Sequence, residues 1–292
     1  MTEVNGVLVV DKPKGITSFD VVRDVRRALK VKKVGHTGTL DPMATGVLPI
    51  CLGDGTKIAQ FITEATKAYD ATVKLGSTTD TLDAEGKVLE TKPVPGLNRE
   101  LIEAALQKFR GTFAQTPPMY SAVKIGGKRL YELARAGEEV ERAARQVTVL
   151  ELTLRDFSAD EIQLSVHCTK GFFVRTLAAE IGEALGCGAH LCALRRTHSG
   201  PFLLAQAIPL SELLAAGPEL AQSRLVGLND SLKDLPALQV TEAEATRVRH
   251  GGVVEVTGRT GLHRVLEPSG ALLAVAEVAR GRLVYRRVLL PE

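Results

Sequence analysis

The sequence predicts an α+β protein with a mixed, largely antiparallel sheet flanked by helices and loops. Residues 146–157 and 161–169 alternate apolar and polar side chains around a short turn, which is typical of a long antiparallel hairpin. Residues 19–30 instead repeat apolar side chains at helical spacing and carry basic side chains on another face. The chain therefore combines sheet and helix in its first large part.

A second, smaller β-rich domain is predicted at the C-terminal end. From about residue 238, a short helix is followed by strands that glycines separate. We place the boundary so that residues 1–232 form the large domain and residues 233–292 the small one.

The other elements follow in chain order. Gly6–Val10 is a buried strand, and Thr17 or Ser18 caps the helix over residues 19–30. The apolar stripe of that helix is expected to be Phe19, Val22, Val25 and Leu29. Further strands are predicted over residues 46–52, 67–76, 87–91, 189–197 and 201–208, and further helices over residues 56–64, 98–110, 174–185 and 241–249, with short ones ending near 136 and starting at Ser211.

Composition bounds the class of protein. With 45% hydrophobic and 24% charged residues among 292, the chain has an ordinary globular composition. Its apolar runs are shorter than the roughly 18 residues of a membrane span, and its start lacks a secretory signal pattern. We therefore expect a cytoplasmic protein that does not contact a membrane.

The four cysteines predict neither disulfides nor a metal site. They lie among apolar residues, as reduced and buried thiols do. Cys187, His190 and Cys192 resemble half of a zinc site, but the other neighbouring pair, His167 and Cys168, would point to opposite faces of a strand. No metal is expected.

Basic residues gather at both ends of the chain, although the net charge is only +3. Residues 12–33 contain eight basic side chains against two aspartates, and residues 247–292 contain eight arginines against four glutamates. This distribution suggests a footprint for a polyanion such as RNA. A charge-rich solvated surface is the alternative explanation for each cluster.

The stretch from Val34 to Gly53 holds the strongest candidate for a catalytic group. A loop of small residues delivers one carboxylate, Asp41, between Leu40 and Pro42. Because Pro42 disfavours the helical region for the residue before it, Asp41 is expected on stiff, extended backbone. Asp-Pro pairs also commonly begin turns, so spacing alone leaves a catalytic role and a turn role equally open.

Three other features are candidates for function. Tyr69 lies on an alternating strand, where a tyrosine is more often a core or interface residue than a catalytic one. Arg175 lies near the apolar stripe of its helix, which predicts a buried carboxylate partner, with Asp41 as the candidate. A hairpin that turns on two glycines carries Lys124, Lys128 and Arg129, which suit a phosphate backbone or an ordinary exposed surface.

The motif G-H-T-G-T-L-D-P at residues 35–42, with A-T-G-V-L-P at residues 44–49, resembles the catalytic motif of the TruB family of tRNA pseudouridine synthases. The resemblance continues, in the family's order, through residues 6–15, 67–69, 118–124, 170–176 and 194–196. The tail resembles, less specifically, a small PUA-type RNA-binding domain. The resemblance implies a pseudouridine synthase catalytic domain over residues 1–232, with an RNA-binding insertion at about 124–146, and a PUA-like domain over residues 233–292.

The resemblance also implies residue roles. Asp41 corresponds to the essential catalytic aspartate, Arg175 to the arginine paired with it, and Tyr69 to the tyrosine that stacks on the base and is implicated as general base. Phe173 departs from the family, which usually has tyrosine there, so that hydroxyl is either dispensable or replaced. The expected RNA-binding residues are His36, which supports flipped-out nucleotides, Lys57 in the active-site neighbourhood, Phe173, Leu194 against the uracil, and Lys124, Lys128 and Arg129.

The implied activity is isomerisation of uridine 55 in the T stem-loop of tRNA, by base flipping. The product is an isomer, so no cofactor is expected. The chain is expected to act as a monomer without guide RNA or an obligatory protein partner. Two alternatives are an RNA-binding or tRNA-folding module, with a chaperone role, and a guide-RNA-dependent synthase. The residues leave open whether the aspartate acts as a nucleophile or removes the C2′ proton.

Overall fold

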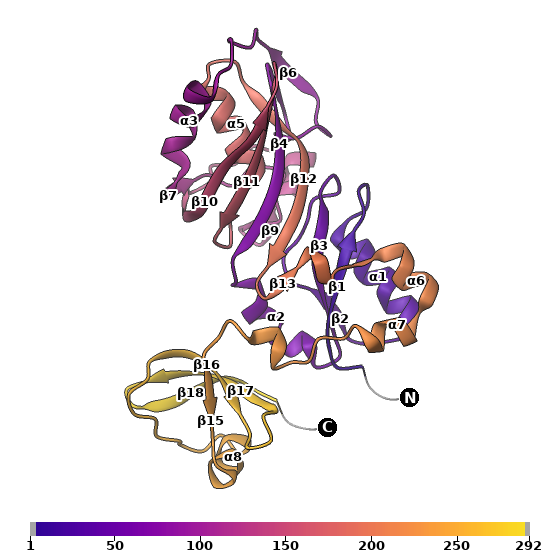
Figure 1. Ribbon diagram of the computed structural model, residues 1–292, viewed down its shortest axis with the longest axis vertical. Coiled ribbons are helices and arrows are strands. Elements are labelled where there is room, and N and C mark those ends of the chain that lie inside the picture. Colours follow the sequence, from indigo (N-terminus) through magenta and orange to yellow (C-terminus); the bar gives the residue numbers. More distant parts are fainter. Residues whose placement is uncertain (1–3, 290–292) are drawn as a thin grey trace. The chain divides into compact units, whose positions relative to one another are not determined.

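The computed structural model describes residues 4–289, which form two compact units (Figure 1). Within the described residues, the first unit comprises residues 4–40, 47–64 and 199–289. The second comprises residues 41–46 and 65–198. The architecture is α+β with a mixed sheet, as the sequence predicts.

Strands and helices alternate along much of the chain. The helices are α1 (Ser18–Leu29), α2 (Gly55–Thr63), α3 (Arg99–Leu106), α4 (Leu130–Arg135), α5 (Val174–Ala184), α6 (Leu210–Ala216), α7 (Pro218–Ser223) and α8 (Glu242–Arg249). The strands are β1 (Gly6–Lys12), β2 (Val34–His36), β3 (Thr45–Leu52), β4 (Lys67–Leu75), β5 (Ser77–Thr79), β6 (Val88–Thr91), β7 (Gly111–Gln115), β8 (Lys124–Ile125), β9 (Lys128–Arg129), β10 (Arg145–Phe157), β11 (Glu161–Cys168), β12 (Ala189–Ser199), β13 (Phe202–Leu203), β14 (Ile208–Pro209), β15 (Ala237–Gln239), β16 (Gly261–Leu266), β17 (Leu272–Ala279) and β18 (Arg282–Val288).

The second unit is a largely antiparallel sheet in the order β12-β4-β11-β10-β7. The β10–β11 hairpin is the one predicted from sequence, and β11 pairs antiparallel with β4 along its whole length. The first two residues of β3 pair in parallel with β12, which makes the sheet mixed. Helices α3 and α5 pack together, and α5 also lies against β4 (Figure 1). Strand β7, at the edge, was not predicted.

In the first unit, β1 lies between β14 and β3, and α1 begins with a capping box between Thr17 and Asp20. The predicted apolar stripe of α1 was partly wrong. Phe19 is 66% exposed, whereas Val21 is fully buried beside Val22. The short helix after β14 begins at Leu210 rather than after a Ser211 cap, and α7 lies in a region predicted to be irregular.

The C-terminal residues of the first unit form a four-stranded sheet, β15-β16-β17-β18, with α8 beside it (Figure 1). Side chains such as Val248, Val265 and Leu283 form a core within this sheet. A separate apolar cluster joins Val275 of β17 to Ile58 of α2. The predicted boundary at residue 232 falls just before β15. The assignment of residues 233–292 as a PUA-like domain stays a prediction, and residues 290–292 lie outside the described part.

Candidate active site

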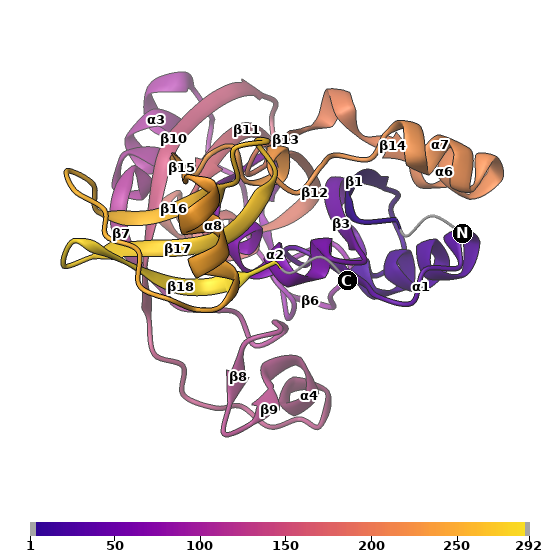
Figure 2. The same cartoon turned by 90° about the horizontal axis from the view of Figure 1, so that it is seen from below.

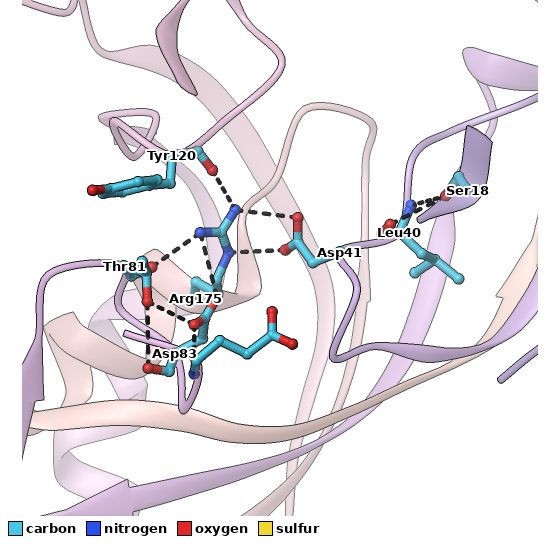
Figure 3. A network of polar contacts seen from close by, with 8 residues as sticks. Ser18, Leu40, Asp41, Thr81, Asp83, Tyr120 and Arg175 are labelled. Carbon is cyan, nitrogen blue, oxygen red and sulfur yellow. Dashed lines mark hydrogen bonds and ion pairs between the residues drawn. The ribbon is translucent and has the colours of Figure 1, made fainter. Parts of the chain in front are cut away.

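Asp41 begins a tight turn and also presents its carboxylate to a second element. Its carbonyl accepts a hydrogen bond from the Ala44 N–H at 3.0 Å, so the Asp-Pro turn considered from sequence is present. Leu40, the residue before it, exchanges two hydrogen bonds of 2.8 and 3.1 Å with the Ser18 hydroxyl at the start of α1 (Figure 3). The backbone that leads to Asp41 is therefore fixed.

Arg175 of α5 is the partner of Asp41, as its place on the helix predicted. Its Nε lies 2.9 Å from Asp41 Oδ2, and its Nη2 donates to Oδ1 at 3.3 Å (Figure 3). The Arg175 side chain is 5% exposed, whereas that of Asp41 is 34% exposed. The pair thus joins a buried guanidinium to a carboxylate that solvent or a ligand can reach.

Two main-chain carbonyls and a second carboxylate complete the surroundings of Arg175. Its Nη1 donates to the Thr81 carbonyl at 3.0 Å, and its Nη2 donates to the Tyr120 carbonyl at 2.7 Å. Asp83 Oδ2 lies 3.6 Å from Nη1. The Tyr120 ring points away from the guanidinium (Figure 3). Bidentate contact with Asp41 and these three groups leave the guanidinium little freedom to rotate.

Asp83 and Tyr120 were missed from sequence. Asp83 lies in a polar loop where Thr81 Oγ1 donates to its Oδ1 at 2.6 Å and the Glu85 N–H donates at 3.0 Å. Leu82, between them, adopts a positive φ of 63°. The one available signal was the density of threonine and aspartate residues in this loop, which favours local side-chain to backbone bonds.

Tyr69 of β4 lies beside Arg196 of β12, whose guanidinium donates a hydrogen bond to the phenol. Burial raises the pKa of the Tyr69 phenol, while Arg196 acts in the opposite direction. Burial likewise lowers the pKa of Arg196, and Tyr69 opposes that shift. The Asp41 charge also acts on Tyr69, raising its pKa, so these two candidates are electrostatically coupled. Arg196 was not assigned a role from sequence.

Gly46 brings the Asp41 turn against β12. It has a φ of +99°, and a Cβ built on it would lie 2.2 Å from the Arg196 carbonyl oxygen. Only glycine fits this close approach. The parallel pairing of Thr45 with Arg195 and of Gly46 with Arg196 follows directly. The loop that carries Asp41 is thereby tied to the strand that carries Leu194 and Arg196.

Leu194 and Phe173 are also part of the second unit. Leu194 is buried in β12, and Thr45 Oγ1 donates to its carbonyl at 3.5 Å. Phe173 is half-buried at the start of α5, one turn before Leu177. Its N–H donates to Gln115 Oε1 at 2.8 Å, and its carbonyl accepts from Gln115 Nε2 at 3.2 Å. The side-chain amide of β7 thus fixes the main chain where α5 begins.

Comparison with known proteins places the chain among its relatives. A profile of the N-terminal domain of TruB family pseudouridylate synthases matches residues 26–174. A profile of the tRNA pseudouridylate synthase B C-terminal domain matches residues 175–273. The chain belongs to the TruB family of pseudouridylate synthases. These matches confirm the family predicted from the motif at residues 35–42. The chain is therefore a pseudouridine synthase, which is an isomerase.

Two relatives of this TruB-family chain are bacterial proteins named tRNA pseudouridine synthase B. Those of Pseudomonas fluorescens and Stutzerimonas stutzeri are 45% and 44% identical to it, over 99% of this chain and 97% of each relative. A chain in the crystal structure of a Cbf5-Nop10-Gar1 complex superposes with a TM-score of 0.79 at 25% identity, covering 99% of this chain and 86% of that chain. The fold is therefore shared with proteins of widely different sequence.

His36 and Lys57 belong to the first unit of this TruB-family chain. His36 ends β2, where it pairs with Ile50 of β3. Lys57 lies on α2 and forms an ion pair of 2.7 Å with Asp54, one turn earlier. The assignment of both residues to RNA binding stays a prediction.

The predicted basic hairpin is present as β8 and β9, in which Lys124 pairs with Arg129. Lys128 and Arg129 are exposed, and Arg129 Nη1 donates to the Tyr131 hydroxyl at 2.8 Å. We call residues 124–142, which comprise this hairpin, α4 and the return segment, the basic projection. It stands apart from β10 and β11 (Figure 2).

The structure also shows the state of the cysteines and whether residues 4–289 contain a metal-binding cluster or a membrane-spanning helix. Cys51, Cys168 and Cys187 are buried free thiols, and burial raises the pKa of Cys51 and of Cys168 to about 12. In residues 4–289 no cluster of three or more His, Cys, Asp or Glu side chains has the arrangement of a metal site. The helices of the same residues are all too short or too polar to cross a membrane.

Proposed function

We propose that this chain converts uridine 55 in the T stem-loop of tRNA into pseudouridine. The observation that carries the proposal is the ion pair between the accessible carboxylate of Asp41 and the buried guanidinium of Arg175. The relatives named tRNA pseudouridine synthase B, which match nearly the whole chain, support tRNA as the substrate.

The reaction breaks the N1–C1′ bond, turns the freed uracil, forms a C5–C1′ bond and releases the C5 proton while N1 gains one. Atoms and electrons balance without a redox partner. Asp41 either attacks the ribose as a nucleophile or removes the C2′ proton. Both routes need an ionised carboxylate, and the adjacent Arg175 charge stabilises that form inside a partly closed site.

Tyr69 is assigned to contact with the uracil base of the target nucleotide. Its ring supplies an aromatic surface for the uracil, and its oxygen is a candidate acceptor for the C5 proton. Because burial raises the pKa of this phenol, proton acceptance requires a group that stabilises the phenolate. The hydrogen bond and charge of Arg196 partly offset the effect of burial, so we assign Arg196 as the partner of Tyr69. Leu194 and Phe173 are assigned to the apolar contacts of the uracil.

RNA is recognised through shape and backbone contacts. Lys124, Lys128 and Arg129 of the basic projection are assigned to phosphates. His36 is assigned to the space that the flipped nucleotides leave, and Lys57 to the RNA near the active site. Flipping the target base costs a few kcal/mol of unstacking, which these contacts offset. We further propose that the enzyme works in the cytoplasm as a monomer, without guide RNA.

The test is conversion of an isolated, unmodified T stem-loop by the purified chain. Wild type is expected to form pseudouridine at position 55, and Asp41→Asn to form none while its RNA affinity stays within a few-fold. Glu219→Gln, which neutralises an exposed acid on α7, serves as a control for general loss of charge. Turnover by Asp41→Asn at the wild-type rate would overturn the assignment.

The similarity to a chain in a Cbf5-Nop10-Gar1 complex raises one alternative, an enzyme that needs partners. Activity of the purified chain on the isolated stem-loop excludes this alternative. Activity that appears only after a cell extract is added would support it.

A further inference from the structure

The segment Pro117–Val123 lies between the Asp41–Arg175 pair and the basic projection. On one side, the carbonyl of Tyr120 accepts a hydrogen bond of 2.7 Å from Arg175 Nη2, the same nitrogen that donates to Asp41 Oδ1. The position of this carbonyl therefore helps to set the direction in which the guanidinium faces Asp41. Two consecutive prolines at the start of the segment limit its backbone freedom.

On its other side, the same segment is hydrogen-bonded to the start of α4 and to the last residue of the basic projection. The Tyr131 N–H donates to the Ser121 carbonyl at 3.1 Å, and the Leu130 N–H donates to the Val123 carbonyl at 2.8 Å. The return segment is attached as well, because Arg142 Nη1 donates to the Pro117 carbonyl at 3.2 Å. A displacement of the basic projection is thus transmitted to the backbone on either side of Tyr120.

Ser121 carries a buried hydroxyl in the middle of this segment. Its side chain is buried, with 5% of the residue exposed, and its hydroxyl has no hydrogen-bond partner. A buried hydroxyl without a partner is unfavourable, and native proteins seldom keep one without a functional reason.

The basic projection contains five basic and four acidic side chains, and the cations gathered around Tyr131 identify what would move it. Lys124 and Lys128 are exposed, and the guanidinium groups of Arg129 and Arg135 flank the Tyr131 ring at 5.8 and 5.6 Å. Tyr131 is therefore both the aromatic centre of this cationic cluster and a donor to Ser121. When phosphate groups of RNA bind these cations, they act on the position of Tyr131, which is hydrogen-bonded to the segment Pro117–Val123.

We propose that RNA bound to the basic projection positions Arg175 against Asp41 through the segment Pro117–Val123. This inference rests on the proposed function and adds that the projection raises the rate of the chemical step as well as RNA affinity. Leu130, Tyr131 and the Tyr120 main chain are positioning residues, because they act on the reaction through Arg175. The ion pair is present in the structure at 2.9 and 3.3 Å, and the coupling restrains it further while substrate RNA is held.

A matched pair of variants at Leu130 tests the coupling. Leu130→Ala and Leu130→Pro both lose the buried side chain, but only proline loses the N–H that donates to Val123. Proline suits this first helical position, and Arg129 before it has the extended backbone that precedes proline (φ −80°, ψ 142°). Single-turnover rates at saturating T stem-loop should be at least about tenfold lower for Leu130→Pro than for Leu130→Ala. Their dissociation constants should agree within about threefold.

Hydrogen exchange supplies a readout that does not depend on turnover. In Asp41→Asn, addition of the T stem-loop should slow amide exchange in residues 119–123 and 174–177, and adding Leu130→Pro should remove the effect in residues 174–177. Equal rates for the two Leu130 variants, or unchanged exchange in residues 119–123, would overturn the coupling. An inactive wild type would overturn the proposed function instead, and the exchange measurement would still test the link.

Discussion

Asp83 presents its carboxylate to the same guanidinium as Asp41, with Oδ2 at 3.6 Å from Arg175 Nη1. Its other oxygen accepts hydrogen bonds from Thr81 and Glu85, and its side chain is 6% exposed. Arg175 therefore bridges a rigid, buried carboxylate and an accessible one. Asp83 fixes the Arg175 guanidinium. Because the guanidinium is fixed, the Asp41 carboxylate bound to it has a defined position for chemistry.

Asp83→Asn is expected to lower the free energy of unfolding by about 1–3 kcal/mol, because Arg175 loses one of its two charged partners. The single-turnover rate on a T stem-loop should fall at least about tenfold, with RNA affinity little changed. Asp80→Asn in the same loop is the control, since an amide oxygen can still accept the Lys87 N–H bonded to Asp80. Similar losses in both variants would contradict a specific role of Asp83.

Gln115→Leu tests the attachment of α5. The substitution leaves the Phe173 N–H without its partner, whereas the Phe173 carbonyl still accepts from the Leu177 N–H, and it should cost about 1–3 kcal/mol of stability in urea unfolding. Gln146→Leu, at an exposed site on β10, should change stability by less than about 0.5 kcal/mol. A loss below about 1 kcal/mol for Gln115→Leu would show that water replaces the amide.

Phe173→Tyr restores the residue usual in the family. Because Gln115 already fixes the main chain at this position, the new hydroxyl is not needed to orient the start of α5. The single-turnover rate should change by less than about tenfold, which corresponds to 1.4 kcal/mol. A larger gain would mean that the site lacks a group that replaces this hydroxyl.

Gly46→Ala should be strongly destabilising and Gly15→Ala only mildly so. Both glycines have a positive φ, of +99° and +90°, but a Cβ at Gly15 meets nothing within 4 Å, whereas one at Gly46 overlaps the Arg196 backbone. The control should cost about 1–2 kcal/mol, the usual penalty for the backbone conformation. Gly46→Ala should cost more than this by at least about 2 kcal/mol in thermal unfolding.

The sequence was sufficient for features that depend on local pattern or on an unusual residue in an apolar setting. The alternation of residues 146–169 predicted the central hairpin. Arg175 near an apolar helix face predicted a buried acid, and Asp41 is that acid. The turn and the ion pair at Asp41 coexist, because the turn uses the carbonyl of Asp41 and the pair uses its carboxylate.

The sequence did not predict features in which tertiary packing selects one of two similar residues. In α1, stripes that include Phe19 or Val21 share Val22, Val25 and Leu29, and packing decides between them. In the loop at residues 77–87, Asp80 and Asp83 have similar surroundings in sequence, yet only Asp83 is placed at Arg175. Strand β7 is short and lies at a sheet edge, so its local pattern is weak.

Tyr69→Phe separates the electrostatic role of the phenol from that of the ring. Burial raises the pKa of Tyr69 above the value near 10 of an unfolded chain, so its contribution to stability is complete below pH 10 and is lost as pH rises through the folded pKa. The stability of wild type relative to Tyr69→Phe should therefore decline above about pH 10 in urea unfolding. The single-turnover rate of the variant should fall at least about 100-fold, since the ring still stacks but no oxygen accepts the C5 proton. A variant with the wild-type rate would restrict Tyr69 to stacking and move proton transfer to another group.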